Sequence, residues 1–155
     1  IWIRDVVHDG PKMTGTSYRV PRYPVAPGQK VPDEDFVIIE SMPVKSLITS
    51  PAADTALTSR KLSVRGHAWA GDRNIKAVDI SLDFGKTWIK TKLNRPPNKY
   101  SWQTWTASVE FPQAGYYEIW SRATDEKGEM QPFAVSWNPK GYLSNVMHRV
   151  HVTVS

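Results

Sequence analysis

The side chains best suited to chemistry are four histidines and one pair of neighbouring acids. The histidines are His8, His67, His148 and His151. His148 and His151 are three residues apart in a segment with strand-like alternation, so they point to opposite faces and cannot share a metal ion. Asp125 and Glu126 precede Gly128 in a polar run typical of a turn, where acids are common. The sequence therefore predicts no metal site and no catalytic set within this chain.

Seven tryptophans are many for a chain of this size. Aromatic rings can stack on sugars or bases, so a tryptophan-rich face would suit an immunoglobulin-like binding module for carbohydrate or a protein ligand. Burial in the core or in a subunit interface is the simpler interpretation, because tryptophan is enriched in both. The two alternatives stay open at this point. The residues concerned are Trp2, Trp69, Trp88, Trp102, Trp105, Trp120 and Trp137.

The last candidate is the loop that contains Lys140. Residues 137–145 read Trp-Asn-Pro-Lys-Gly-Tyr-Leu-Ser-Asn. Pro139 interrupts strand pairing and Gly141 permits an unusual φ angle, so Lys140 is a cation on a constrained backbone. From these residues alone, an exposed lysine in a connection is the simpler interpretation.

The elements that position these residues belong to a chain of 155 residues, which is long enough to bury a hydrophobic core. The hydrophobic fraction of 40% excludes a disordered chain, and no apolar run approaches the roughly 20 residues of a membrane helix. The absence of cysteine excludes disulfides and thiolate metal ligands. The net charge of +5 is spread over cations that alternate with apolar residues, so neither nucleic acid nor a membrane is an expected partner.

Hydrophobic periodicity changes near residue 58. Seven of the twelve prolines precede that point, which predicts an extended arm with a single strand at residues 36–39. Beyond it, apolar and polar residues alternate with period two and no helical period occurs. Strands are expected at residues 62–68, 78–82, 87–93, 104–111, 117–123 and 146–154. The sequence therefore predicts an all-β fold, an immunoglobulin-like (E-set type) antiparallel β-sandwich preceded by an extended Pro-rich arm.

Several motifs follow one another along the second part of the chain. They are Val64-Arg65-Gly66-His67-Ala68-Trp69-Ala70-Gly71, Val78-Asp79-Ile80-Ser81-Leu82-Asp83-Phe84-Gly85-Lys86-Thr87-Trp88, Ala123-Thr124-Asp125 with Gln131-Pro132, and Trp137-Asn138 through His148-Arg149-Val150. Together they resemble the C-terminal dimerisation domain of the sulfite oxidase family of molybdenum enzymes. Residues 42–51 are similar to the segment that joins the molybdenum domain to that domain, so the resemblance covers nearly the whole chain.

The resemblance implies two parts. Residues 1–50 would be the tail of a molybdopterin-binding domain, and residues 51–155 the immunoglobulin-like domain that pairs two subunits into a homodimer. The molybdenum–molybdopterin cofactor would be held by a cysteine of the upstream molybdopterin domain, so the present chain, read as a fragment, is expected to bind no cofactor and to be inactive alone. The parent would oxidise sulfite to sulfate and pass electrons to a cytochrome or haem acceptor, and bacterial family members suggest a periplasmic location.

The resemblance also implies a role for Lys140. In sulfite oxidases the position before the glycine of the closing motif is typically an arginine that lines the anion pocket, whereas plant nitrate reductases have an uncharged residue there. Lys140 keeps the charge but not the bidentate geometry of arginine. It is therefore expected to be a substrate-binding residue for sulfite.

Overall fold

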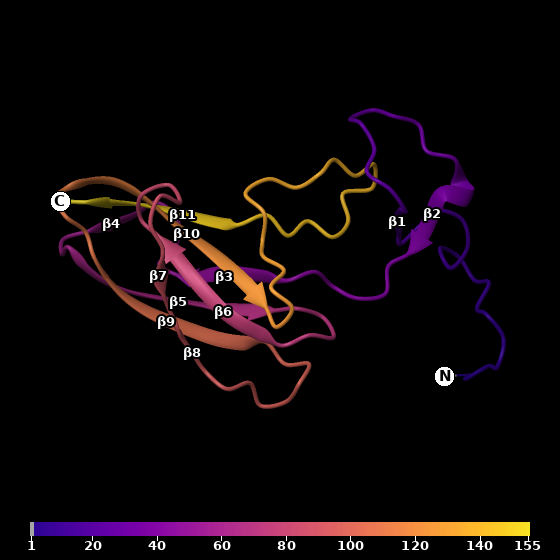
Figure 1. Cartoon of the computed structure of the whole chain (residues 1–155), viewed down its shortest axis with the longest axis horizontal. Coiled ribbons are helices and arrows are strands. Elements are labelled where there is room, and N and C mark those ends of the chain that lie inside the picture. The colour runs from indigo at the N-terminus through magenta and orange to yellow at the C-terminus, as the bar shows by residue number, and fades with distance from the viewer. Residues whose placement is uncertain (1) are drawn as a thin grey trace. The chain divides into compact units, whose positions relative to one another are not determined.

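The computed structural model describes residues 2–155, which divide into two compact units. One unit contains the residues up to Ser41 together with Val135–Ser144, and the other contains Met42–Ala134 and Asn145–Ser155. Strands are the main regular structure in both units, as Figure 1 shows, and a short 3-10 helix is the only helix in the described residues. None of the described residues therefore forms a helix of the length and apolarity that spanning a membrane requires.

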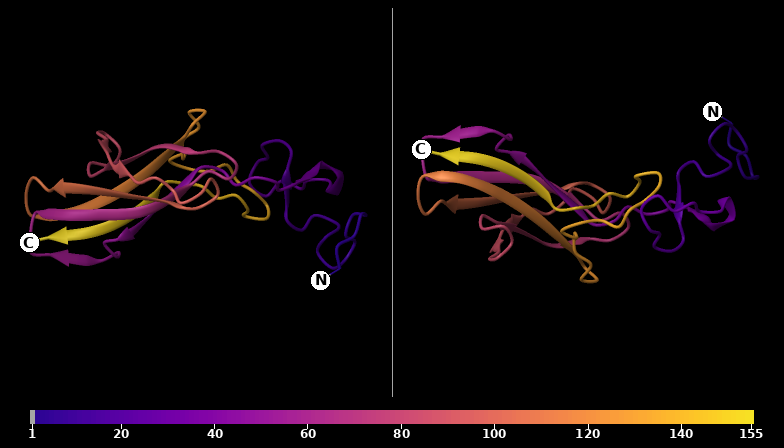
Figure 2. Two further views of the ribbon diagram at one scale, coloured as in Figure 1. Left: turned by 90° about the horizontal axis from the view of Figure 1, so that it is seen from below. Right: turned by 90° about the horizontal axis from the view of Figure 1, so that it is seen from above.

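The larger unit is a sandwich of two β-sheets. The five-stranded sheet consists, in spatial order, of β4 (Thr55–Leu57), β11 (His148–Val154), β10 (Gly115–Asp125), β6 (Ile75–Ser81) and β7 (Ile89–Lys90). The four-stranded sheet consists of β3 (Lys45–Ser50), β5 (Lys61–Trp69), β9 (Gln103–Glu110) and β8 (Lys92–Leu93). All pairs are antiparallel except β11 with β4, which are parallel and lie side by side at one edge (Figure 2). The predicted all-β, immunoglobulin-like sandwich is thus confirmed.

The core lies between the two sheets and follows the period-two pattern of the sequence. On β9, Trp105 and Val109 are buried, while Thr104 and Ser108, which directly precede them, are exposed. The same alternation occurs on β5, β10 and β11. The buried hydrophobic cluster comprises Val44, Ile48, Val64, Ala68, Ala70, Ile75, Val78, Ile80, Trp105, Val109, Phe111, Ile119, Ala123, Val150, Val152 and Val154.

Gly66 allows the largest core side chain to lie against the backbone of β5. Trp105 is fully buried, and it is the β9 residue directly opposite Gly66. A Cβ atom added at Gly66 would fall far inside contact distance of both the Trp105 ring and the carbonyl oxygen of Leu47. The glycine of the first sequence motif is therefore needed because β3 and the indole ring occupy the space of a side chain.

One predicted strand is divided between the two sheets. Residues 87–93 were expected to form the return strand of a hairpin, but β7 pairs with β6 in one sheet and β8 pairs with β9 in the other. The chain changes sheet at Thr91, whose N–H and hydroxyl both donate to the carbonyl oxygen of Val78, at 3.0 and 2.8 Å. These hydrogen bonds replace the strand pairing that is lost at the crossing point.

The sequence prediction of a single strand before residue 58 was wrong, since β1, β3 and β4 also form there, and β3 is the longest of them. Its buried positions include Ser46, which is fully buried beside the apolar residues Val44 and Ile48. A polar residue at an inward position hides the alternation from a hydrophobic pattern. β3 pairs with β5 and so extends the four-stranded sheet.

The smaller unit contains turns and one short strand pair. β1 (Arg19–Pro21) pairs antiparallel with β2 (Phe36–Ile38), and the 3-10 helix η1 (Asp33–Asp35) precedes β2. Asp35 accepts a hydrogen bond of 2.7 Å from the Tyr23 hydroxyl. The strand expected at residues 36–39 is present as β2. The segment before it folds back on itself through β1 and its turns, in place of the extended arm that its prolines suggest.

Candidate functional site

Asp125 fixes the turn after β10, in agreement with the interpretation of the Asp125–Glu126 pair as turn residues. Its side chain is 2% exposed and accepts hydrogen bonds from Arg73 at 2.8 Å and from the backbone N–H groups of Lys127 and Glu129 at 2.9 Å. Burial by itself raises the pKa of Asp125, but these donors outweigh it and hold the pKa below its usual value. The carboxylate is therefore an ionised structural anchor.

The histidines lie in separate places. His148 Nδ1 accepts the backbone N–H of Ile48 at 3.1 Å and so connects the two sheets, whereas His151 pairs with Asp54. The two side chains point to opposite faces of β11, as expected. Among residues 2–155, no three histidine or acidic side chains come together in an arrangement that could hold a metal ion.

The loop that carries Lys140 is held at its base by Gln131. This side chain is 1% exposed, accepts the N–H of Ala123 at 2.9 Å, and donates to the carbonyl oxygens of Asn145 and Val146 at 3.2 and 3.1 Å. One amide group thus joins β10 to the C-terminal end of the loop. The Asn145 side chain donates in turn to the carbonyl oxygen of Val44 at 3.3 Å. The base of the loop is part of the sandwich core.

The tip of the loop is shaped by Asn138. Its side-chain oxygen accepts the N–H of Lys140 at 3.0 Å, its carbonyl oxygen accepts the N–H of Gly141 at 3.0 Å, and its side-chain amide donates to the carbonyl oxygen of Tyr142 at 3.3 Å. Gly141 has a φ of +69°, which favours glycine. Residues 138–142 therefore form a constrained turn, as the Pro139–Gly141 pattern predicts.

Lys140 projects from this turn and is exposed. Within the described residues 2–155, its ammonium group has no acidic partner at ion-pair distance. The loop segment Val135–Ser144 belongs to the same compact unit as the N-terminal residues, and within that unit Tyr142 stacks on Tyr18 with ring centroids 5.9 Å apart. Lys140 thus belongs to the same compact unit as most of the segment that the resemblance assigns to the molybdopterin domain.

A second feature, absent from the sequence predictions, is a group of aromatic and arginine side chains on the outer face of the five-stranded sheet. We call it the aromatic–arginine surface. Trp120 is its centre, 6% exposed, with the Phe133 ring at 5.3 Å and the Phe84 ring edge-on at 6.1 Å. The Arg149 guanidinium lies 4.6 Å from the Trp120 and Phe133 ring centroids, and Arg122 lies 3.9 Å from the centroid of Trp88. Its members are Phe84, Trp88, Trp120, Arg122, Phe133 and Arg149.

The turn that begins this surface is fixed by Asp83. Its carboxylate accepts the Thr87 hydroxyl at 2.6 Å, the Thr87 N–H at 2.8 Å and the Ser81 hydroxyl at 2.8 Å. The two Thr87 donors, led by the hydroxyl, lower the pKa of Asp83 to about 2. Part of this surface could have been recognised from the sequence, because the motif residues from Ser81 to Trp88 build the turn. The residues of β10 and β11 lie beside that turn only in the folded chain.

The seven tryptophans do not form one face. Trp105 is in the core, while Trp88 and Trp120 belong to the aromatic–arginine surface. Trp102, 62% exposed, stacks on Trp69 at 5.8 Å and packs near His67 on the outer face of the other sheet. Trp2 and Trp137 lie in the smaller unit. Within residues 2–155 the seven tryptophans are therefore distributed over several places and do not form one shared face.

Comparison with known proteins identifies the family. Residues 36–155 match the model of the Mo-co oxidoreductase dimerisation domain. The mitochondrial sulfite oxidase of Homo sapiens is 40% identical over 126 residues, covering 76% of this chain and 23% of the relative. Nitrate reductase [NADH] 2 of Phaseolus vulgaris is 37% identical over 131 residues, covering 76% of this chain and 15% of the relative.

A solved structure agrees with these sequence matches. The sulfane dehydrogenase SoxCD from Paracoccus pantotrophus superposes with a TM-score of 0.66 at 25% identity, covering 86% of this chain and 34% of that one. The chain spans about a quarter or less of the length of the sulfite oxidases and nitrate reductases it matches. On this evidence the chain belongs to the Mo-co oxidoreductase dimerisation domain family.

Proposed function

We propose that this chain is the C-terminal, subunit-pairing part of a molybdenum oxidoreductase of the sulfite oxidase type. The sandwich serves homodimerisation, and the N-terminal segment, residues 1–50 in the sequence prediction, is the tail of the molybdopterin domain. The compact units divide after Ser41 and β3 pairs with β5, which supports a limit nearer Ser41 in this proposal. The family match over residues 36–155 supports the pairing role.

We further propose that Lys140 supplies positive charge to the oxyanion pocket of the parent enzyme. The observation that carries this proposal is the membership of the Lys140 loop in the unit of the N-terminal segment. An exposed cation without an acidic neighbour is available to an anion, and a charged hydrogen bond to an oxyanion is strong. Sulfite, an oxyanion, is the proposed substrate.

The cofactor proposal concerns the upstream domain. The chain has no cysteine, and residues 2–155 present no metal-binding group, so these residues do not fit the task of holding molybdenum. We assign the molybdenum–molybdopterin cofactor to the molybdopterin domain of the parent, with a cytochrome or haem as electron acceptor. The parent is proposed to be periplasmic, whereas the human relative is named as a mitochondrial enzyme.

Steady-state kinetics of the intact parent test the role of Lys140. We expect Lys140→Ala to raise the sulfite KM by about tenfold to a hundredfold, because a hydrogen bond to a charged group contributes about 1.5–3 kcal/mol, while kcat changes little. Lys140→Arg should retain or lower the KM, since arginine offers two donors. Lys127→Ala, which removes another exposed lysine at a turn, is the matched control. An unchanged KM in Lys140→Ala would remove this residue from the pocket.

Sedimentation equilibrium of the present chain tests the pairing role. We expect a monomer–dimer equilibrium at micromolar concentrations. A strictly monomeric chain at high micromolar concentration would contradict self-association by this domain and leave its fold unaffected.

A further inference from the structure

We propose that the aromatic–arginine surface is the face on which a second copy of this chain packs. The outer face of the five-stranded sheet, and not that of the four-stranded sheet, is then the pairing face. This inference rests on the proposed function, which supplies the second copy. Four observations carry it: composition, rigidity, charge and self-complementarity.

The surface has the amino-acid composition of a binding hot spot in a protein–protein interface. Tryptophan and arginine are enriched among the residues that contribute most to binding, and such residues are ringed by others that exclude water. Trp120 is nearly buried within one copy, and Phe84 and Phe133 beside it are 58% and 55% exposed. Apolar rings this exposed around a central tryptophan lose most of their contact with water only when another surface covers them.

The surface is held rigid before any partner binds. Asp83 fixes the turn that presents Phe84, and Phe84 itself has a φ of +59°, an unusual conformation for an aromatic residue. The space next to it is small, because a Cβ at Gly85 would approach the Trp120 ring to 3.3 Å. A positive φ at Phe84 costs conformational energy, and the exposed ring gains no core packing in return. This favours a binding role for Phe84.

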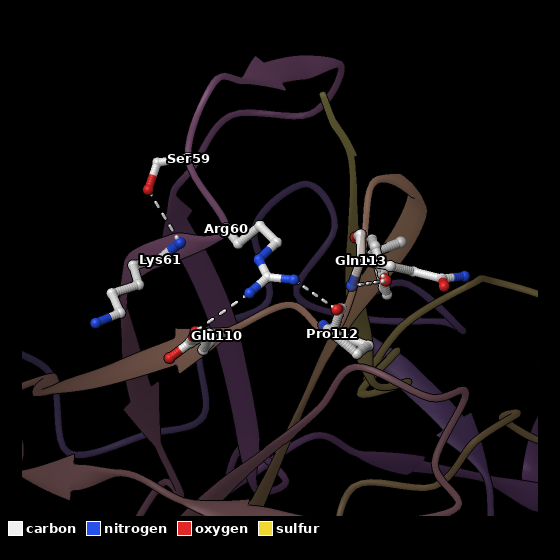
Figure 3. Close-up of polar contacts among 7 residues, drawn as sticks. Ser59, Arg60, Lys61, Glu110, Pro112 and Gln113 are labelled. Carbon is white, nitrogen blue, oxygen red and sulfur yellow. Dashed lines mark hydrogen bonds and ion pairs between the residues drawn. The ribbon is translucent and has the colours of Figure 1, made fainter.

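The two outer faces of the sandwich differ in net charge. Among the strand residues that share the outward side of the five-stranded sheet with Trp120, the charges nearly balance, with three cations and two acids, and Arg122 pairs with Asp79 at 3.7 Å. They are Asp79, Lys90, Glu118, Arg122 and Arg149. On the four-stranded sheet four cations accompany one acid: Lys45, Lys61, Arg65, Lys92 and Glu110. That acid lies 3.9 Å from a further cation, Arg60, at the end of the sheet (Figure 3).

Two copies cannot pair through the basic face without bringing like charges together, which disfavours association. The aromatic–arginine surface has no such penalty and is also self-complementary. In a two-fold contact each residue of one copy meets a residue of the other, and the reciprocal contact forms as well. A surface that carries both exposed rings and arginines can form ring–ring and arginine–ring contacts twice across one axis.

The first test compares surface variants of the present chain by sedimentation equilibrium. Phe84→Asn with Phe133→Ser removes both exposed rings, and asparagine tolerates the positive φ at position 84, so the fold is retained. We expect the dimer dissociation constant to rise by at least about tenfold. The matched control is Trp102→Ser, which removes an equally exposed ring from the basic face and should leave the constant unchanged.

The second test places one spin label on each face and does not depend on any loss of affinity. The chain has no cysteine, so Lys86→Cys and Ser108→Cys each give a single attachment point. Lys86 lies in the turn of the aromatic–arginine surface and Ser108 on the outer face of β9, and both are exposed. We expect pulsed electron–electron double resonance to give a shorter distance between the spin labels of the two copies at position 86 than at position 108.

The outcomes separate this inference from the proposed function. A wild-type dimer that the Phe84 and Phe133 substitutions leave intact, with the shorter distance at position 108, overturns the assignment of the face and leaves the pairing role in place. A wild-type chain that stays monomeric overturns the pairing role itself, and the face assignment with it.

Discussion

Replacing Gln131 with methionine isolates the hydrogen bonds at the base of the Lys140 loop. Methionine fills nearly the same volume but has no amide group, so the core stays packed while three hydrogen bonds are lost. The buried N–H of Ala123 would lose its partner, at a cost of about 1–3 kcal/mol. The two hydrogen bonds to the Asn145 and Val146 carbonyl oxygens contribute about 0.5–1.5 kcal/mol each. We expect the free energy of unfolding to fall by about 3 kcal/mol.

Urea unfolding followed by tryptophan fluorescence measures this loss. The matched control is Gln113→Met, the same change at an exposed glutamine, which should stay within about 0.5 kcal/mol of the wild type. If Gln131→Met were as stable as Gln113→Met, the reasoning that Gln131 clamps the loop would be refuted.

The Gln131→Glu variant tests the same hydrogen bonds through the pH dependence of the free energy of unfolding. An ionised glutamate can accept the Ala123 N–H but would face the carbonyl oxygens of Asn145 and Val146, so its folded pKa should lie above the ordinary value of about 4.3. A raised folded pKa means that the stability is complete below the unfolded pKa and is lost as pH rises through the folded pKa. The variant should therefore approach the wild type at acidic pH and fall behind it at neutral pH.

Three further changes test other parts of the sandwich. Gly66→Ala should destabilise the fold by about 3 kcal/mol in urea unfolding, because the new methyl group meets the Trp105 ring, and an effect below about 0.5 kcal/mol would contradict that contact. Burial first, and the charge of a neighbouring lysine second, lower the pKa of His148, so stability should fall as pH decreases from 6.5 toward the folded pKa; His148→Gln should show a weaker dependence in that window. Thr87→Val should raise the pKa of Asp83 from about 2 toward 3.8 in an NMR titration, and an unchanged value would mean that other groups lower it.

Much of the sandwich could be predicted because its strands have one buried and one exposed face. Trp105 and Val109 on β9 follow the two-residue period without interruption, and the structure places both in the core. The period fails where a polar residue is buried, as at Ser46 on β3, and where a short segment belongs to two sheets, as on either side of Thr91. In both cases the deciding interaction is with a strand distant in sequence.

Some features of the candidate site could likewise be predicted from the sequence, and others could not. The constrained turn at Lys140 could be predicted from Pro139 and Gly141, since these residues restrict or permit particular backbone angles locally. The role of Gln131 could not, because its partners are main-chain groups that adjoin it only after β10 and β11 pair. The same holds for the contact of Arg149 with Trp120, which depends on strand register.

The interleaving of the two compact units has a consequence for inheritance. The chain passes from one unit to the other after Ser41, Ala134 and Ser144, so the smaller unit is encoded by two stretches of sequence separated by more than ninety residues. A single crossover between two related genes therefore cannot transfer both stretches of this unit without the sandwich sequence between them. A graft that brings only the N-terminal stretch from a distant relative would therefore replace Tyr18 without Tyr142, the ring on which it stacks.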